Sequence, residues 1–304
     1  MARTIIHIGM PRTASTFLQQ EFFPNVSDFE FYGVDRTQYS TVFQKILYQD
    51  DSIFNPLEIA AELKFILEKN TILSNELFVG QSLYLSSTNR SRTARRLKQF
   101  FPDAEIILLL RNQVSLLESL YSIGIYSGMT LNPVDFIRFS NEPSSIDHPL
   151  YPTFTEAETT EAYYFSNLVA LYQSLFSEVH VLLFEDFKSG PASFAERLNH
   201  MLHLKTAPLE NPEKRVNKSL SSRQIRFIRR LNLYKPVLNR GSFSKRIFGF
   251  QLRFIEHNIS KGQHFNFDAI LTRKLKETFN DDNAKLMNLL PELRNSETFR
   301  KEYF

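Results

Sequence analysis

The stretch RTIIHIGMPRTASTFLQQEFF, residues 3–23, carries the clearest structural pattern of the chain. It opens with TIIHIG at 4–9, a short aliphatic run that ends at a glycine, as buried parallel strands often do. A loop follows, and an amphipathic pattern starts at residue 15. A strand, a tight loop and a helix in this order direct several backbone N–H groups at one point, which stabilises an anion. We therefore predict a phosphate- or sulfate-binding loop.

The side chains of this loop suit the same purpose. Arg12 supplies a fixed charge with forked donors, and hydroxyls come from Thr13, Ser15 and Thr16. The loop lacks the G-x-x-x-x-G-K-[ST] pattern of nucleoside-triphosphate loops, because no lysine follows Ala14. A simpler alternative is an ordinary strand-to-helix turn with a Ser or Thr cap, and a second site is needed to decide between them.

Short apolar runs alternate with longer amphipathic ones along the chain. The runs expected to be strands are 4–9, 71–74, 105–110 and 179–184, and the expected helices are 15–23, 57–68, 88–100, 113–127, 157–176 and 191–202. This alternation predicts an α/β fold with a central parallel sheet and helices on both faces. The polar, proline-containing stretch at 141–155 is interpreted as a long surface loop and a candidate substrate lid.

Composition limits the classes of protein to consider. The 304 residues are 42% hydrophobic, which suits one large domain over 1–304. The absence of cysteine excludes a disulfide framework, a thiolate nucleophile and a zinc–thiolate site. The net charge of +3 is too small to indicate nucleic acid. With no signal-like or membrane-spanning run, we expect a soluble cytoplasmic protein.

A second candidate site lies at EIILLLRNQVSLLESLY, residues 105–121. An expected strand runs directly into Arg111, and Ser119 follows eight residues later on the next expected helix. Ligands of open α/β sheets bind at the carboxyl edge of the strands, so the arginine and the hydroxyl could share one. Taken alone, the two residues could also be a strand-terminal surface arginine and a serine bonded to its own helix.

Together the two motifs resemble the sulfotransferases that use 3′-phosphoadenosine 5′-phosphosulfate (PAPS). PRTASTF at 11–17 looks like the loop P-[KR]-[ST]-G-T-T-[WF] of that family, and RNQVSLLES at 111–119 is similar to its R-N-P motif with a following serine, with Gln113 in place of proline. VHVLLFEDFKSGPASFAERLNHMLHL at 179–204 and RVNKSLSSRQIRFIRRLN at 215–232 are similar to later segments of the family, the second in bacterial members. The resemblance covers roughly the whole chain and implies a P-loop-like fold with a helical C-terminal part from about 214 to 304.

The resemblance also implies roles for individual residues. Arg12 would contact the bridging oxygen and stabilise the leaving phosphate, and Phe17 would stack near adenine. The remaining cofactor-binding positions would be Thr13, Ala14, Ser15 and Thr16 at the phosphosulfate, and Arg111, Ser119, Arg215 and Lys218 at the 3′-phosphate. Ala14 stands where the family has glycine, so a positive φ there would be strained.

The implied reaction is in-line transfer of a sulfuryl group to a hydroxyl or amine, which needs positioning and stabilisation of the leaving oxygen. We expect no metal. The acceptor needs a general base, and Glu76, directly after the expected strand at 71–74, resembles the acidic base of carbohydrate sulfotransferases. A solvated or capping glutamate is the alternative. His7, within the first expected strand, is the weaker candidate and more consistent with a packed core histidine.

The C-terminal third is basic. From Lys214 to Ile255 there are twelve Lys or Arg and no Asp or Glu, interleaved with aromatic residues. We interpret this segment as contacting the cofactor and an acidic carbohydrate or glycolipid acceptor, and peripheral contact with a membrane surface is a second interpretation. A simpler alternative is that part of the charge binds the cofactor's phosphates and the rest is a solvated helix face. No recognisable nucleic-acid module accompanies it. Specificity for the acceptor is expected in the loops at 30–55 and 128–156, and the sequence leaves both the acceptor and the oligomeric state open.

Two other functions remain open at this point. A P-loop kinase for a small molecule would share the fold, but the missing Gly-Lys-Ser/Thr and the pairing of Arg111 with Ser119 argue against it. A nucleotide-binding protein without catalytic activity is the other, and Ala14 and Gln113 are the hints in its favour. Magnesium dependence would separate the sulfotransferase from the kinase, and turnover would separate it from the non-catalytic protein.

Overall fold

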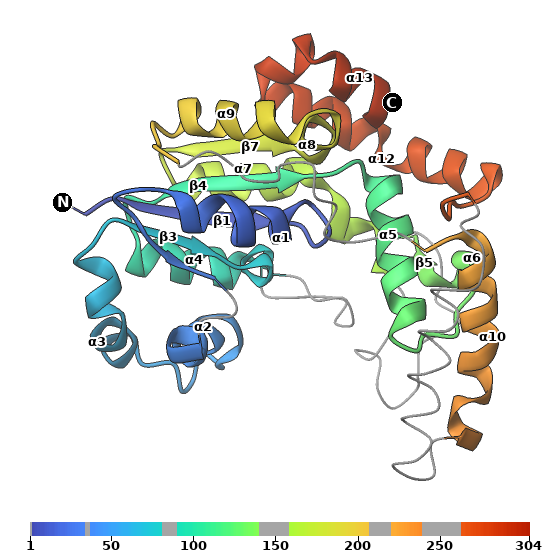
Figure 1. Ribbon diagram of the computed structural model, residues 1–304, viewed down its shortest axis with the longest axis horizontal. Coiled ribbons are helices and arrows are strands. Elements are labelled where there is room, and N and C mark those ends of the chain that lie inside the picture. Colours follow the sequence, from blue (N-terminus) through green and yellow to red (C-terminus); the bar gives the residue numbers. More distant parts are fainter. Residues whose placement is uncertain (1, 34–36, 81–89, 140–157, 207–219, 239–262) are drawn as a thin grey trace.

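A five-stranded parallel sheet forms the centre of the computed structural model (Figure 1). The structure describes residues 2–33, 37–80, 90–139, 158–206, 220–238 and 263–304. The strands of the sheet, in spatial order, are β2 (Glu30–Tyr32), β3 (Thr71–Ser74), β1 (Thr4–Gly9), β4 (Glu105–Leu110) and β7 (Val179–Leu183). A separate parallel pair joins β5 (Ile137–Arg138) and β6 (Glu158–Thr159). The predicted α/β class with a parallel sheet is confirmed.

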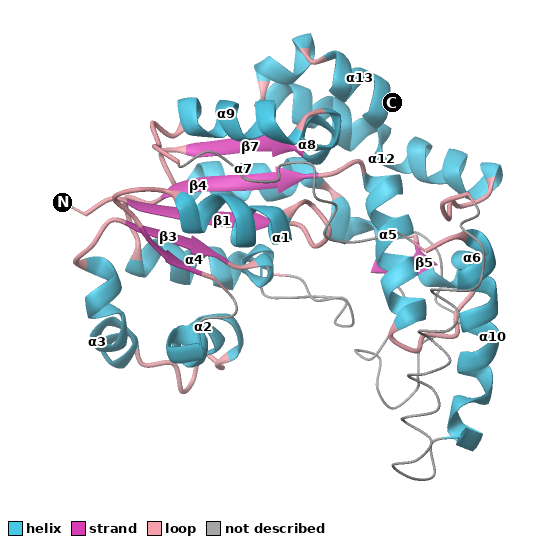
Figure 2. Cartoon of the chain, in the orientation of Figure 1, coloured by secondary structure: helices cyan, strands magenta, loops and turns pink. Residues whose placement is uncertain are grey.

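Helices cover both faces of the sheet and continue into a helical C-terminal part (Figure 2). The α-helices are α1 (Ser15–Phe17), α2 (Thr37–Tyr48), α3 (Pro56–Leu67), α4 (Arg90–Phe100), α5 (Gln113–Tyr126), α6 (Pro133–Phe136), α7 (Phe165–Leu175), α8 (Phe184–Ser189), α9 (Pro191–Met201), α10 (Ser222–Leu238), α12 (Ala269–Leu289) and α13 (Glu297–Tyr303). Shorter helical turns are η1 (Leu18–Phe22), η2 (Phe23–Asn25), η3 (Glu76–Val79), η4 (Thr160–Tyr163) and η5 (Pro291–Asn295).

Alternation along the strands divides the interior into two cores. Ile6 and Ile8 of β1 belong to the larger core, which includes buried residues of α4, α5 and α7. Ile5 belongs to the smaller core, which includes α1, η1 and α9. Successive side chains of a strand point to opposite faces, so a continuous aliphatic run is what a sheet covered on both sides requires.

The structure differs from the predicted elements in a few places. The helix expected at 15–23 is three short pieces in succession, α1, η1 and η2, and the helix expected from 157 begins only at Phe165. The region 30–55, expected to be a loop, contains β2 and α2 and is followed by α3. The sequence hid β2 because three residues are too short to show a period. The candidate lid at 141–155 lies outside the described residues.

Buried polar contacts tie the C-terminal helices to the sheet's own helices. Asp282 of α12 caps the first turn of α7: it accepts from the backbone N–H of Phe165 at 2.7 Å and from the N–H and hydroxyl of Ser166. Gln113, which stands where the resembling family has proline, donates from Nε2 to Asn283 Oδ1 at 2.7 Å. Gln113 therefore links α5 to α12 by a buried hydrogen bond.

Among the described residues, no helix combines the length and the apolar character that crossing a membrane requires.

Replacing the buried cap tests how much the C-terminal helices stabilise the fold. Asp282→Ala should lower the free energy of unfolding by about 2 to 3 kcal/mol, because three donors on α7 lose their acceptor in a buried place. Asp281, the exposed neighbour, provides the matched control. Asp281→Ala should change the free energy of unfolding by less than about 0.5 kcal/mol. Urea denaturation of both variants measures the difference, and equal losses would contradict the capping role.

Candidate active site

The two motifs singled out in the sequence meet at the carboxyl edge of the sheet. β1 pairs with β4 in parallel register, with Gly9 opposite Leu109, and the N–H of Met10 donates to the carbonyl of Leu109 at 3.2 Å. The loop after β1 and the loop after β4 therefore leave the sheet side by side (Figure 1). This is the edge where open α/β sheets bind ligands.

The loop after β1 is tight and strained. Arg12 and Ala14 both have positive φ, 69° and 64°, in the left-handed region. Each such residue without the freedom of glycine costs about 1 to 3 kcal/mol, and this kind of strain concentrates at functional sites. The strain anticipated for Ala14 is therefore present. At Gly9 a Cβ would lie within 3.1 Å of Ser15 Oγ, Thr13 Oγ1 and His7 Nε2, so the loop can close over β1 only with a glycine there.

Arg12, Arg111 and Ser119 come together at this edge. Arg12 donates from Nε to Ser119 Oγ at 3.1 Å. Arg111 donates from Nη1 to the carbonyl of Arg12 at 3.0 Å and from Nε to Ser115 Oγ at 3.0 Å, and its guanidinium lies 4.6 Å from the centre of the Phe184 ring. The structure therefore unites the two predicted motifs, with Arg12 between Arg111 and Ser119.

The charges of the two arginines are poorly compensated. Neither arginine forms an ion pair within 4.0 Å with a described residue. Burial lowers the pKa of Arg111 to about 10, and the neighbouring charge of Arg12 acts in the same direction. Burial also lowers the pKa of Arg12, against the attraction of Glu76. Two adjacent, half-buried cations with no anion paired to them form a place that favours an anionic ligand.

A second layer of carboxylates moderates this charge, and the sequence reasoning missed it. Glu185, at the start of α8, accepts from the N–H of Asn112 at 2.9 Å and from the Tyr303 hydroxyl at 3.3 Å. Burial raises the pKa of Glu185 and of Glu118, and the charge of Arg111 opposes this for both. The position of Glu185 just after a strand was the available signal.

The loop hydroxyls have different surroundings. Thr13 is fully buried and donates to the carbonyl of Met10 at 2.5 Å, so its hydroxyl is committed to the loop. Ser15 is 2% exposed, and its Oγ is buried without a hydrogen-bond partner. Thr16 is half-buried, and its hydroxyl forms no hydrogen bond to a described residue. Buried hydroxyls are normally paired, so Ser15 Oγ is placed to receive a partner from a ligand.

Glu76 lies near this loop, at the start of η3 just beyond β3. Asn75 fixes the turn by accepting from the N–H of Leu77 at 2.9 Å. Burial raises the pKa of Glu76, while the nearby Ser15 hydroxyl and the charge of Arg12 oppose the rise. No hydrogen bond of ordinary geometry joins Ser15 to the carboxylate. Glu76, the candidate base, therefore lies close enough to Arg12 for their charges to interact.

One predicted residue, Phe17, lies in the core, and two others lie where the structure describes nothing. Phe17 is 4% exposed and packs in the smaller core, with its ring centre 4.9 Å from that of Phe187. Its ring has almost no surface left for adenine, so the structure favours a packing role over the predicted stacking. Arg215 and Lys218 lie outside the described residues.

His7 is a buried histidine beneath the loop, as the sequence suggested. It is fully buried, and its Nδ1 lies 2.7 Å from Ser74 Oγ, which also accepts from Gln19 Nε2 at 3.0 Å. Burial lowers the pKa of His7 to about 3, so the ring is neutral at ordinary pH. A neutral, enclosed ring supports the loop and is not suited to act as a base toward an outside acceptor.

The strain at position 14 can be tested by relieving it. Ala14→Gly should raise the free energy of unfolding by about 0.5 to 1 kcal/mol, because glycine adopts φ of 64° without the steric cost of a Cβ. Thermal and urea unfolding measure the change. Ala61, exposed within α3, is the matched control, and Ala61→Gly should lower stability by about 1 kcal/mol. A loss of stability in Ala14→Gly would contradict the strained geometry.

The burial of His7 predicts a specific dependence of stability on pH. His7 binds a proton near pH 6.5 in the unfolded chain but only near pH 3 in the folded chain. The stability that depends on the neutral ring is therefore complete above pH 6.5 and is lost as pH falls. By pH 5 the loss is about 2 kcal/mol. The stability difference between wild type and His7→Gln should therefore shrink by about 2 kcal/mol from pH 7 to pH 5. Denaturant titrations measure it, with His200→Gln, an exposed histidine, as control. A constant difference would refute the buried neutral state.

No family model matches the sequence, and no curated protein matches it significantly. Among solved structures, the fold is similar to a sulfotransferase from Alicyclobacillus acidocaldarius, with a TM-score of 0.56 and 14% identity over 99% of this chain and 100% of that one. The sulfotransferase domain from the curacin biosynthetic pathway (14% identity, 70% and 78% of the two chains) and mouse sulfotransferase SULT7A1 complexed with PAP (15%, 99% and 89%) are less similar in structure, with TM-scores of 0.38 and 0.40. The chain therefore has the α/β fold of the Alicyclobacillus sulfotransferase.

Proposed function

We propose that this protein is a sulfotransferase that uses PAPS as donor. The observation that carries the proposal is the pair of half-buried arginines, Arg12 and Arg111, side by side at the carboxyl edge of the sheet with no ion pair to a described residue. The fold and the sequence motifs at 11–17 and 111–119 support the same function. A kinase loop would need a lysine directly after Ala14, where this chain has Ser15.

The donor set fits a ligand with two phosphate ends. Arg12, Thr16 and the unpaired hydroxyl of Ser15 would hold the phosphosulfate, and Arg111 would hold the 3′-phosphate. Arginine forks match the oxygens of a phosphate in both places. Ser119 now accepts from Arg12, so a cofactor that engages the two at different ends would replace this hydrogen bond. The predicted contributions of Arg215 and Lys218 remain part of the proposal.

The bound cofactor would supply the activated sulfuryl group, and the chain's residues would position it and handle the charges. Arg12 would stabilise negative charge that develops on the leaving phosphate. Glu76 would take the proton of the attacking acceptor group. Its raised pKa suits that task, because a carboxyl whose pKa is nearer neutral pH is a stronger base. The proposed transfer involves no metal.

For the acceptor, we propose an acidic carbohydrate or glycolipid. One face of α10 supports this choice: Arg223, Arg226 and Arg230 are exposed at helical spacing, with Phe227 between them 46% exposed. Cations beside an aromatic ring suit an acidic sugar, through ion pairing and stacking. The same face would also suit an anionic membrane surface, which is the second interpretation of this segment.

Binding of the expected product tests the proposed cofactor. Calorimetric titration with 3′-phosphoadenosine 5′-phosphate should show binding that needs no magnesium, and Arg111→Ala should weaken it about 10- to 100-fold, because charge-assisted hydrogen bonds contribute about 1.5 to 3 kcal/mol. Arg273→Ala, on the exposed face of α12, is the matched control and should bind as wild type does. ATP with magnesium is the parallel ligand. Preference for magnesium ATP would establish the kinase alternative instead.

Turnover separates the enzyme from a nucleotide-binding protein without activity. With PAPS and a panel of acidic and neutral glycans, the wild type should release 3′-phosphoadenosine 5′-phosphate faster in the presence of an acceptor. Glu76→Gln should keep the binding and lose most of the turnover, because the amide cannot accept the proton. Tight binding without acceptor-dependent turnover in the wild type would favour the non-catalytic alternative.

A further inference from the structure

A second basic hollow lies away from the candidate active site, on the flank of α4. It has a volume of about 180 Å³ and lies between α4 and the turn that joins α2 to α3. The lining residues are Asp51, Phe54, Arg92, Arg95, Arg96 and Gln99. None of them belongs to the loops after β1 and β4, so the proposed function leaves this cluster of three arginines unexplained.

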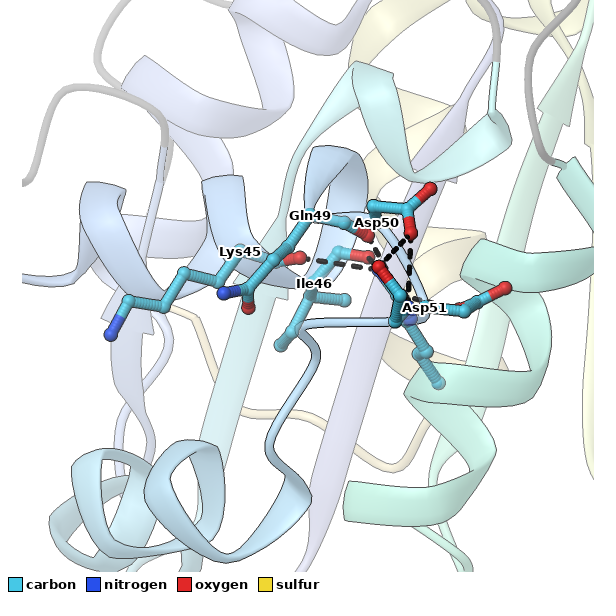
Figure 3. A network of polar contacts seen from close by, with 7 residues as sticks. Lys45, Ile46, Gln49, Asp50 and Asp51 are labelled. Atoms are coloured by element: carbon cyan, nitrogen blue, oxygen red, sulfur yellow. Dashed lines mark hydrogen bonds and ion pairs between the residues drawn. The ribbon is translucent and has the colours of Figure 1, made fainter.

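One of the three arginines has a structural role. Arg96 is 4% exposed and donates to the carbonyls of Lys45, Ile46 and Gln49 at 2.8 to 3.2 Å and to Asp51 at 2.6 Å. Figure 3 shows part of this network at the turn that follows α2. The guanidinium of Arg96 lies 3.7 Å from the centre of the Phe54 ring. Arg96 caps the C-terminal end of α2 and is held rigidly.

The other two arginines have no such partners. Arg92 and Arg95 form no hydrogen bond or ion pair with the residues that the structure describes, and Arg92 Nε is buried without an acceptor. The charge of Arg92 lies close enough to lower the pKa of Arg96, in addition to the effect of burial. A buried donor on a charged group is costly to leave unpaired, so the hollow favours an anion that accepts from it.

The balance of charge supports the same conclusion. Three guanidinium groups face one lining carboxylate, that of Asp51, which is already bonded to Arg96. Asp50 also lies near Arg92 and Arg96, but it accepts from the N–H and hydroxyl of Ser52. Counting both aspartates, three positive charges against two negative ones leave one in excess. The excess belongs to the side of Arg92 and Arg95, where no carboxylate is bonded.

We propose that this hollow is a second anion-binding site that takes a sulfate or phosphate group. Arg92 and Arg95 bind its oxygens with their forked donors, and Gln99 supplies an amide at the same wall. Arg96 and Phe54 form the rigid floor. The group is either a free ion or an ester carried by a larger molecule, and the shared chemistry is a tetrahedral oxyanion.

The test isolates this site from the candidate active site. The Arg111→Ala variant is titrated calorimetrically with inorganic sulfate and with inorganic phosphate, with chloride replaced to keep the ionic strength constant. It should bind one ion, and adding Arg92→Gln and Arg95→Gln should weaken that binding at least tenfold. Adding Arg273→Gln instead removes an exposed charge elsewhere and should change nothing. No binding in Arg111→Ala, or equal binding with and without the Arg92 and Arg95 changes, would overturn the proposal.

Further arms identify the source of the group and keep the two proposals separate. Glucose 6-phosphate that binds more tightly than inorganic phosphate, with the same loss in the Arg92 and Arg95 variant, points to an ester on a larger molecule; equal affinities point to a free ion. Arg92→Gln with Arg95→Gln should bind 3′-phosphoadenosine 5′-phosphate as the wild type does. The two proposals can therefore fail independently, and matching melting temperatures exclude loss of fold.

Discussion

The parallel pairing of β1 with β4 is the constraint on which the candidate site depends. Both strands are buried on two faces, and their alternate side chains pack in two different cores. A slip of one residue in the register would turn each side chain toward the opposite core. The register places Gly9 opposite Leu109, and the loops that follow the two strands start at the same edge. Arg12 and Arg111 are 99 residues apart in the chain, yet one donates to the carbonyl of the other at 3.0 Å.

Holding two like charges together requires the rest of the structure to compensate. Glu76, Glu118 and Glu185 surround the arginines from three different elements, and burial raises the pKa of each carboxyl while a nearby arginine opposes the rise. None of these carboxylates comes within ion-pair distance of either arginine. The partial compensation stabilises the cluster and leaves the guanidinium groups able to bind an anion. The hollow on α4 is similar: Arg96 is paired, and Arg92 Nε has no partner in the part of the chain that the structure describes.

The C-terminal helices complete the site from behind. Asn112 donates from its backbone to Glu185, and its side chain donates to the carbonyl of Glu302 in α13. Gln113 reaches Asn283 of α12. The residues that follow Arg111 are thus fixed by elements nearly 200 residues later in the chain. The chain accommodates both Gln113 and Ala14: Gln113 forms a buried hydrogen bond, and Ala14 adopts a strained φ of 64°.

Four of the five strands of the central sheet and the loop after β1 could be predicted from the order of the residues. Residues 4–9, 71–74 and 105–110 are strands with the predicted bounds, and the fourth run ends at Leu183 because Phe184 already starts α8. Aliphatic runs of this kind predict buried strands. The Gly, Arg and hydroxyl pattern of the loop indicates that it binds an anion. The sequence also predicted Arg111 at the carboxyl edge of the sheet, where it could share a ligand with Ser119. The contacts of Arg111 and Ser119 with Arg12 of the loop are visible only in the structure.

The other roles follow from tertiary contacts. Phe17 sits in the smaller core because packing against Phe187 takes up its ring, and no local pattern distinguishes that from stacking on a ligand. Glu185 and Asp282 act through backbone N–H groups of distant segments, which spacing along the chain does not reveal. Arg96 donates to the carbonyls of Ile46 and Gln49, whereas Arg92 Nε has no acceptor among the described residues, and the sequence does not distinguish these two arginines. Such roles arise from contacts between segments far apart in sequence. Burial and turn conformation depend on neighbouring residues, so they can be predicted from the sequence.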